Sequence, residues 1–201
     1  MSVLLEYFSN YLYLFILILL AVFMYILLRR MNVNYYVYPS ELDHNFVTQT
    51  IRIMSNSNWN KKYNIKNVAS PEMADILIHL TPRSEMDKWH TTPEYYPGTN
   101  KQIRFSITVQ HAKMKPEIFI DSENWLNGVP ESGLSLDKYR SYVIQHEFGH
   151  GLGYDHDECA ENTGICPVMY QATRGCGKGN VCGFKVSKRD LNGNRMDVSY
   201  L

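Results

Sequence analysis

Residues 146–156 read HEFGHGLGYDH and place three histidines at spacings that could bind one metal ion. His146 and His150 are four residues apart, so on a helix their imidazoles project from the same face, one turn apart. Gly153 can adopt the left-handed conformation that ends a helix and reverses the chain, which would bring His156 to the same ion. Three neutral imidazoles leave one coordination position open, as is typical of catalytic zinc sites.

Glu147 follows the first predicted ligand directly and is the candidate general base. The segment matches HExxHxxGxxH at all five specified positions, a pattern that chance would produce at roughly one position in ten million. Coincidence is therefore set aside. The remaining histidines match no ligand spacing and are interpreted as ordinary structural or surface residues: His44, His79, His90 and His111.

On these residues the chain resembles the metzincin clan of zinc-dependent peptidases, whose motif continues to a methionine-containing turn beneath the metal. The sequence CPVM at 166–169 supplies such a turn, with Met169 as the floor under the histidines and not as a ligand. Upstream, 74–78 looks like the third strand of the matrixin sheet, and 117–121 followed by Trp125 looks like its fifth. The stretch from Tyr139 into the motif is similar to a bacterial metzincin-like family of unknown substrate. These similarities cover roughly residues 33–197.

The resemblance implies a twisted five-stranded mixed sheet, an active-site helix beneath it and a C-terminal helix from Lys188 to about Asp197. Ser187 and Asp190 are spaced as a capping box for that last helix. In the clan the fourth strand is the antiparallel edge that pairs with an extended substrate. Here it would be Ile103–Gln110, with Ile103, Phe105 and Ile107 as candidate contacts.

Hydrophobic patterning independently predicts an α+β domain, because most predicted strands precede the motif helix. A helix is expected over Glu41–Met54 with Ser40 as N-cap, and another begins near Ser135 and runs into the motif. Residues Thr81–Asn100 are predicted to form a loop. The strands are expected at Val33–Tyr38, Ile65–Val68, Asp75–Leu80, Ile103–Gln110 and Glu117–Asp121.

Two residues near the motif are given no part in catalysis. Tyr170 directly follows Met169, whereas clan members with a tyrosine ligand carry it two residues beyond the methionine, so Tyr170 is not predicted to bind zinc. Asp157 follows the third histidine, and we expect it to brace the base of the active-site helix.

The composition is that of a single packed domain with an appendage. The chain has 201 residues, 45% of them hydrophobic, which argues against disorder. Twenty Lys and Arg residues balance twenty Asp and Glu residues, so nothing indicates a nucleic-acid partner.

The appendage is an uncharged N-terminal stretch, residues 7–28, predicted to form a transmembrane helix over about 11–28 that contacts membrane lipid. A cleaved signal peptide is the alternative, but the basic first region and the cleavage site are both missing. The sequence therefore predicts a single-pass anchor over residues 1–30 and a peptidase-like domain over 31–201.

All four cysteines surround the predicted methionine turn and allow three disulfide pairings. A second metal site is the weaker alternative, because the C-x6-C-x9-C-x5-C spacing lacks a CxxC pair. Family resemblance favours Cys159 with Cys176, which leaves Cys166 with Cys182. Disulfides indicate an extracytoplasmic domain, whereas Arg29 and Arg30 after the anchor indicate a cytoplasmic one.

Together these observations predict a membrane-anchored zinc metalloendopeptidase with one Zn²⁺ per chain and a peptide or protein substrate. Glu147 would act as general base on a zinc-activated water. A zinc-binding structural or interaction module without turnover is the main alternative. Hydrolysis of an amide other than a peptide is a third possibility.

Overall fold

The computed structural model describes residues 12–22, 30–86, 88–89, 92–110, 113–159, 166–175 and 188–193. The chain divides into two units, Met1–Met31 and Asn32–Leu201. In the first unit, residues 12–22 form a helix whose side chains are all exposed. Within the described ranges, no helix combines the length and the apolar character needed to span a membrane. Residues 11 and 23–28 of the predicted transmembrane segment lie outside those ranges.

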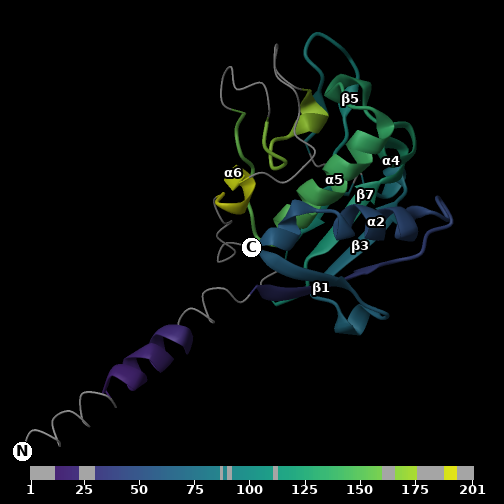
Figure 1. Cartoon of the computed structure of the whole chain (residues 1–201). Helices are drawn as coiled ribbons and strands as arrows, with labels where there is room; N and C mark the ends of the chain where they lie inside the picture. Colours follow the sequence, from purple (N-terminus) through teal and green to yellow (C-terminus); the bar gives the residue numbers. More distant parts are fainter. Residues whose placement is uncertain are drawn as a thin grey trace, which may run out of the picture. The chain divides into compact units, whose positions relative to one another are not determined.

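The second unit contains the predicted five-stranded mixed sheet, in the order β2-β1-β3-β7-β6 (Figure 1). Three parallel strands form its centre: β1 (Met31–Val37), β3 (Ile76–Thr81) and β7 (Glu117–Asp121). The edges are β2 (Tyr63–Asn67) and β6 (Ile107–Val109), and β6 runs antiparallel to β7. The strands predicted at Val33–Tyr38, Ile65–Val68, Asp75–Leu80 and Glu117–Asp121 are thus confirmed, with bounds that differ by at most two residues.

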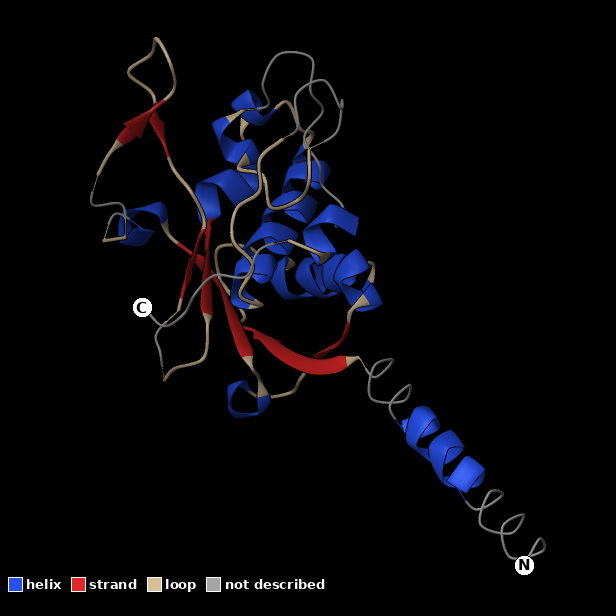
Figure 2. Ribbon diagram, turned by 90° about the vertical axis from the view of Figure 1, so that its left-hand side faces the viewer, coloured by secondary structure: helices blue, strands red, loops and turns tan. Residues whose placement is uncertain are grey.

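One face of the sheet is covered by helices (Figure 2). The central helix is α5 (Leu136–Gly151), which begins after Ser135 as predicted and contacts β6 and β7. Against it pack α2 (Phe46–Ser55) and α4 (Ser122–Asn127). Residues 142–150 of α5 are all buried. Polar side chains on a helix that is buried in this way need hydrogen-bond partners inside the protein.

The helix predicted over Glu41–Met54 starts later than expected, at Phe46, and its N-cap is Asn45 rather than Ser40. Ser40 Oγ instead accepts a hydrogen bond from Leu42 N at 3.2 Å, and Asp43 Oδ1 accepts one from Asn45 N at 2.9 Å. Short polar side chains that bond the nearby backbone in this way compete with helix formation. The second oxygen of Asp43 accepts from the indole of Trp125 at 2.8 Å, which fixes the turn in place.

The single strand predicted over Ile103–Gln110 is wrong, because the segment is divided. Ile103 belongs to β5 (Gln102–Ile103), which pairs with β4 (Glu94–Tyr95) in a separate two-stranded sheet. Only β6 belongs to the main sheet. Residues 104–106 between them lie outside the ladder of β6 with β7 and make bonds that involve side chains: Asn124 Nδ2 donates to Arg104 O at 2.9 Å, and Ser106 Oγ accepts from Asp121 N at 3.2 Å.

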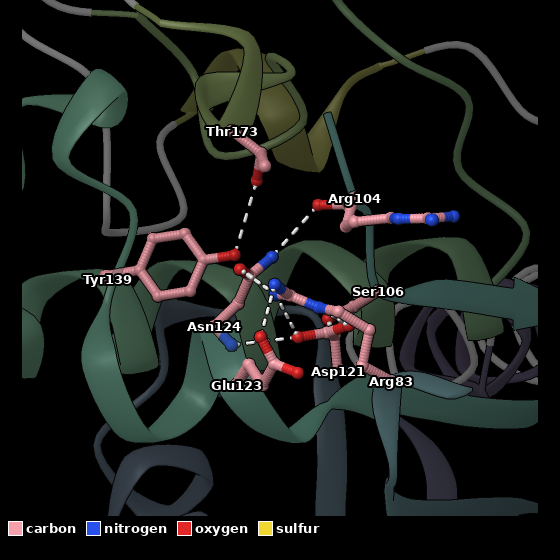
Figure 3. A network of polar contacts seen from close by, with 8 residues as sticks. All are labelled: Arg83, Arg104, Ser106, Asp121, Glu123, Asn124, Tyr139 and Thr173. Atoms are coloured by element: carbon pink, nitrogen blue, oxygen red, sulfur yellow. Dashed lines mark hydrogen bonds and ion pairs between the residues drawn. The ribbon is translucent and has the colours of Figure 1, made fainter. Parts of the chain in front are cut away.

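Arg83 organises the polar network that holds this divided segment (Figure 3). Its guanidinium makes two hydrogen bonds to the carboxylate of Asp121, at 2.7 and 3.0 Å, and further ones to Glu123 and Asn124. The Asp121 side chain is fully buried, so it requires this charged partner. Asp121 also caps α4 by accepting a hydrogen bond from Asn124 N at 2.8 Å. This cap favours the start of α4, a helix that was not predicted from the sequence.

Two other predicted regions differ from the expectation. The predicted loop Thr81–Asn100 contains α3 (Arg83–Met86) as well as β4. The predicted C-terminal helix is present as α6 (Lys188–Leu191). Residues 192–193 are described and are not helical, so the helix ends earlier than predicted, whereas Ser187 and residues 194–197 lie outside the described residues, as do His90 and His111.

Candidate metal centre and cleft

The structure brings His146, His150 and His156 together, with ligand atoms that lie within 4.8 Å of one another. His146 and His150 occupy successive turns of α5, as their spacing predicted. Beyond α5, Gly153 has φ +85°, the left-handed conformation expected at this position. That turn reverses the chain and returns His156 to the other two rings.

Backbone carbonyls fix the orientation of two of the imidazoles. Nδ1 of His146 is 2.7 Å from Val168 O, and Nδ1 of His150 is 2.8 Å from Tyr154 O. A carbonyl oxygen only accepts, so each Nδ1 carries the proton and each Nε2 presents a lone pair. Histidine ligands in metal sites are oriented by this kind of second hydrogen bond.

The three Nε2 atoms converge as ligands of one small cation do. His150 Nε2 lies 3.2 Å from His146 Nε2 and 3.0 Å from His156 Nε2. Tetrahedral zinc with nitrogen ligands at its usual bond length places those nitrogens about 3.3 Å apart. Lone pairs pointed at one another repel unless a cation lies between them, so the residues present fit a zinc ion.

Burial keeps these imidazoles neutral, which is the form that binds metal. It lowers the pKa of His146 well below its ordinary value and that of His150 to about 4. The pKa of His156 is also lowered, chiefly by partial desolvation of its ring. All three therefore remain available as ligands at neutral pH.

Glu147 is buried beside the histidines, and burial raises the pKa of its carboxyl to about 7. A hydroxyl from the edge strand opposes that shift: Thr108 Oγ1 lies 2.8 Å from Glu147 Oε2. A carboxyl with a pKa near neutrality can both take up and release a proton, as a general base requires.

A cleft of about 360 Å³ opens over these groups. Its lining includes Phe105, Ile107 and Thr108 from the region of the edge strand, and an ion pair of 2.8 Å between Arg174 and Glu94. Of the three predicted substrate-edge residues, Phe105 and Ile107 therefore line the cleft. Ile103 is buried in β5 and pairs with Glu94, so its assignment to the substrate edge was wrong.

Met169 lies in a turn directly against α5, where the motif predicted it. Tyr170 N donates to Pro167 O at 3.1 Å to close the turn, and Asp157 N donates to Met169 O at 3.1 Å. Asp190 contributes differently from the prediction: its buried side chain accepts from Met169 N at 3.0 Å and so anchors the turn. Tyr170 donates its hydroxyl to Gly175 O at 3.2 Å.

Gly149 allows this close contact between α5 and the methionine turn. A Cβ at that position would collide with Met169 Sδ and lie 2.9 Å from Cζ2 of the buried Trp59. We expect Gly149→Ala to lower the free energy of unfolding by about 1–3 kcal/mol, because the packed core must shift to admit the methyl group. Urea denaturation of the purified protein measures this.

Gly151→Ala is the matched control for Gly149→Ala. The nearest atoms to a Cβ there would all belong to the side chain of Ile76, with Cδ1 at 3.1 Å and Cγ2 at 3.4 Å, so the contact is looser than at Gly149. Equal midpoints for the two variants would contradict the tight packing of Met169 on α5.

The described disulfide joins Cys159 to Cys166, so the expected pairing of Cys159 with Cys176 is wrong. Cys159 follows His156 by three residues and Cys166 precedes Met169 by three. The hydrogen bond between Asp157 N and Met169 O holds these two segments together, which places Cys166 within reach of Cys159. Cys176 and Cys182 lie outside the described residues.

Comparison with solved structures finds a similarity to archaemetzincin from Methanopyrus kandleri, at 16% sequence identity and a TM-score of 0.40. The matched region covers 81% of this chain and 92% of that one. No curated protein shows significant sequence similarity to this chain. The family model that matches covers residues 22–195, including the whole cleft and all three histidines, and the chain therefore belongs to the family described as "Protein of unknown function (DUF3152)".

Proposed function

We propose that this chain is a zinc-dependent metalloendopeptidase of the metzincin type, held at a membrane by its N-terminal apolar segment. The observation that carries the proposal is the convergence of three Nε2 atoms beside a buried glutamate, in a cleft bordered by an edge strand. His146, His150 and His156 would hold the zinc ion, which would supply Lewis-acid chemistry to a water molecule and to a carbonyl oxygen.

Glu147 moves the proton in this proposal. Its carboxylate takes a proton from the attacking water and then gives that proton to the amine that leaves when the peptide bond breaks. In the metal-free site burial raises the pKa of this carboxyl to about 7, which makes Glu147 a stronger base than an exposed glutamate.

The edge strand β6 is the proposed seat of the substrate backbone. It is the last strand of the sheet, and within the described part of the chain its outer edge pairs with no other strand. An extended peptide can add to such an edge through main-chain hydrogen bonds, which bind any sequence of suitable shape. Apolar side chains in the cleft, such as Phe105 and Ile107, would then contact the side chains of the substrate.

Two observations support a membrane-anchored enzyme that acts outside the cytoplasm. Residues 12–22 are helical and their side chains are exposed, within a stretch that carries no charge from residue 7 to 28. The disulfide between Cys159 and Cys166 is typical of oxidising compartments. Protection of the second unit from added protease in sealed spheroplasts or cells would instead indicate a cytoplasmic face.

The proposal is tested by measuring zinc content and peptide cleavage on the same preparation of the full chain in detergent. We expect one zinc per chain by elemental analysis, and cleavage of members of a mixed peptide library that stops when a chelator removes the metal. Zinc without cleavage would favour a binding module, and absence of zinc would overturn the metal site itself.

A further inference from the structure

The edge strand presents polar side chains to the part of α5 that carries the site. Thr108 pairs in register with Ile118, whose side chain is fully buried beneath the helices. Gln110, two residues on, extends from the same side of the strand. Thr108 Oγ1 lies 2.9 Å from Glu147 O, and Gln110 Nε2 donates to His150 O. Both residues therefore bond to residues of the proposed catalytic centre.

Thr108 differs from Gln110 because it also reaches a reactive side chain. Its Oγ1 is 2.8 Å from Glu147 Oε2 and nearly as close to the carbonyl of the same residue. A hydroxyl carries a single proton, which Thr108 shares between these two oxygens when the carboxyl is ionised, and so it ties the end of the Glu147 side chain to its own backbone. The terminal side-chain torsion of a glutamate takes a broad range of values when nothing restrains it. The bond to Thr108 therefore narrows the range of orientations that the carboxylate can adopt.

We propose that Thr108 is a positioning residue for Glu147: its hydroxyl holds Oε2, so that Oε1 is left facing the substrate to exchange the proton. The inference rests on the proposed role of Glu147 as general base. It also connects two parts of the proposed mechanism, because the strand that receives the substrate backbone is the strand that orients the base. A purely structural connection between β6 and α5 is the competing explanation.

The two explanations predict different kinetics. If Thr108 orients the base, its hydroxyl affects the chemical step, and substrate binding and metal content are unchanged. Displacing a catalytic group slightly from its reactive position lowers the rate on the order of 10- to 100-fold. If Thr108 only joins the two elements, loss of its hydroxyl lowers stability without a selective effect on kcat.

The experiment compares Thr108→Val with Thr108→Ser in the full chain, using a peptide that the wild type cleaves. Valine has the same shape without the donor, and serine keeps the hydroxyl. We expect Thr108→Val to lower kcat by about 10-fold or more at unchanged KM and unchanged zinc content. Serine should restore kcat to within about 3-fold of the wild type, since its hydroxyl reaches the same oxygen.

Thr50→Val is the matched control, because Thr50 Oγ1 is buried in α2 and has no hydrogen-bond partner among the residues that the structure describes. It should leave kcat unchanged. Wild-type kcat in Thr108→Val would overturn the inference, and so would equal losses in the valine and serine variants. A wild type that binds zinc and cleaves nothing would instead overturn the proposed function, on which the inference depends.

Discussion

Replacing Glu147 by glutamine is expected to lower the rate of peptide cleavage by about 10²–10⁴-fold while zinc stays bound. The amide is nearly isosteric with the carboxylate and can still accept a hydrogen bond from Thr108, 2.8 Å away in the wild type. It cannot take a proton from the attacking water. Glu147 is not one of the three converging ligands, so metal content should not change.

Stability distinguishes this variant from a damaged protein. In the metal-free wild type, burial raises the pKa of Glu147 from 4.5 to about 7, so the folded state holds its proton more tightly than the unfolded state. The stability that this gives is present below pH 4.5 and is lost as the pH rises toward 7. Glutamine never ionises, so Glu147→Gln should be at least as stable as the wild type at pH 8.

The exposed Glu85→Gln is the control for Glu147→Gln and should cleave at the wild-type rate. Wild-type activity in Glu147→Gln would show that another group removes the proton. Loss of zinc from the same variant would show that Glu147 holds the metal in place.

The metal centre could be predicted in advance because its geometry is almost entirely local. A four-residue spacing on a helix, followed by a glycine turn, brings three side chains together within 11 residues, whatever the rest of the fold does. The structure confirms that convergence and adds the carbonyls of Val168 and Tyr154 that orient two of the rings. The first of these depends on the methionine turn, 22 residues further along the chain.

Predictions that depended on distant contacts were less successful. The alternating pattern of Ile103–Gln110 is typical of one strand, yet Arg83, Asp121 and Asn124 hold its middle in another conformation. No local signal could reveal that network, since Arg83 lies about 40 residues before both Asp121 and Asn124 in the sequence. The predicted pairing of Cys159 with Cys176 was wrong for a related reason. The three spacings between the cysteines do not reveal the backbone contact that brings Cys159 to Cys166.

Thr108 illustrates the same limit at the proposed site. A threonine in an alternating strand is ordinary in sequence, because β-branched residues are common there. Its significance comes from a contact with Glu147 across 39 residues of chain. The residues proposed to bind zinc were recognisable from their spacing, whereas the residue proposed to orient the base could be found only from the fold.

Removal of a ligand should have a different effect from removal of the base. We expect His146→Ala to lose both zinc and activity, because two imidazoles remain where three converged and the Nδ1 bond to Val168 O is lost as well. Changing a residue that only supports a ligand typically weakens metal binding by 10- to 100-fold, so loss of the ligand itself should exceed about 100-fold. Zinc titration against a competing chelator measures the change.

His44→Ala provides the matched control, since His44 is exposed and lies in the turn before α2. It should keep one zinc per chain and full activity. If His146→Ala retained zinc with wild-type affinity, the metal would have to be held elsewhere, and the convergence of the three Nε2 atoms would not be the catalytic centre. The decisive comparison is between His146→Ala and Glu147→Gln: both should be inactive, but only the histidine variant should be free of metal, because one residue holds the ion and its neighbour moves the proton.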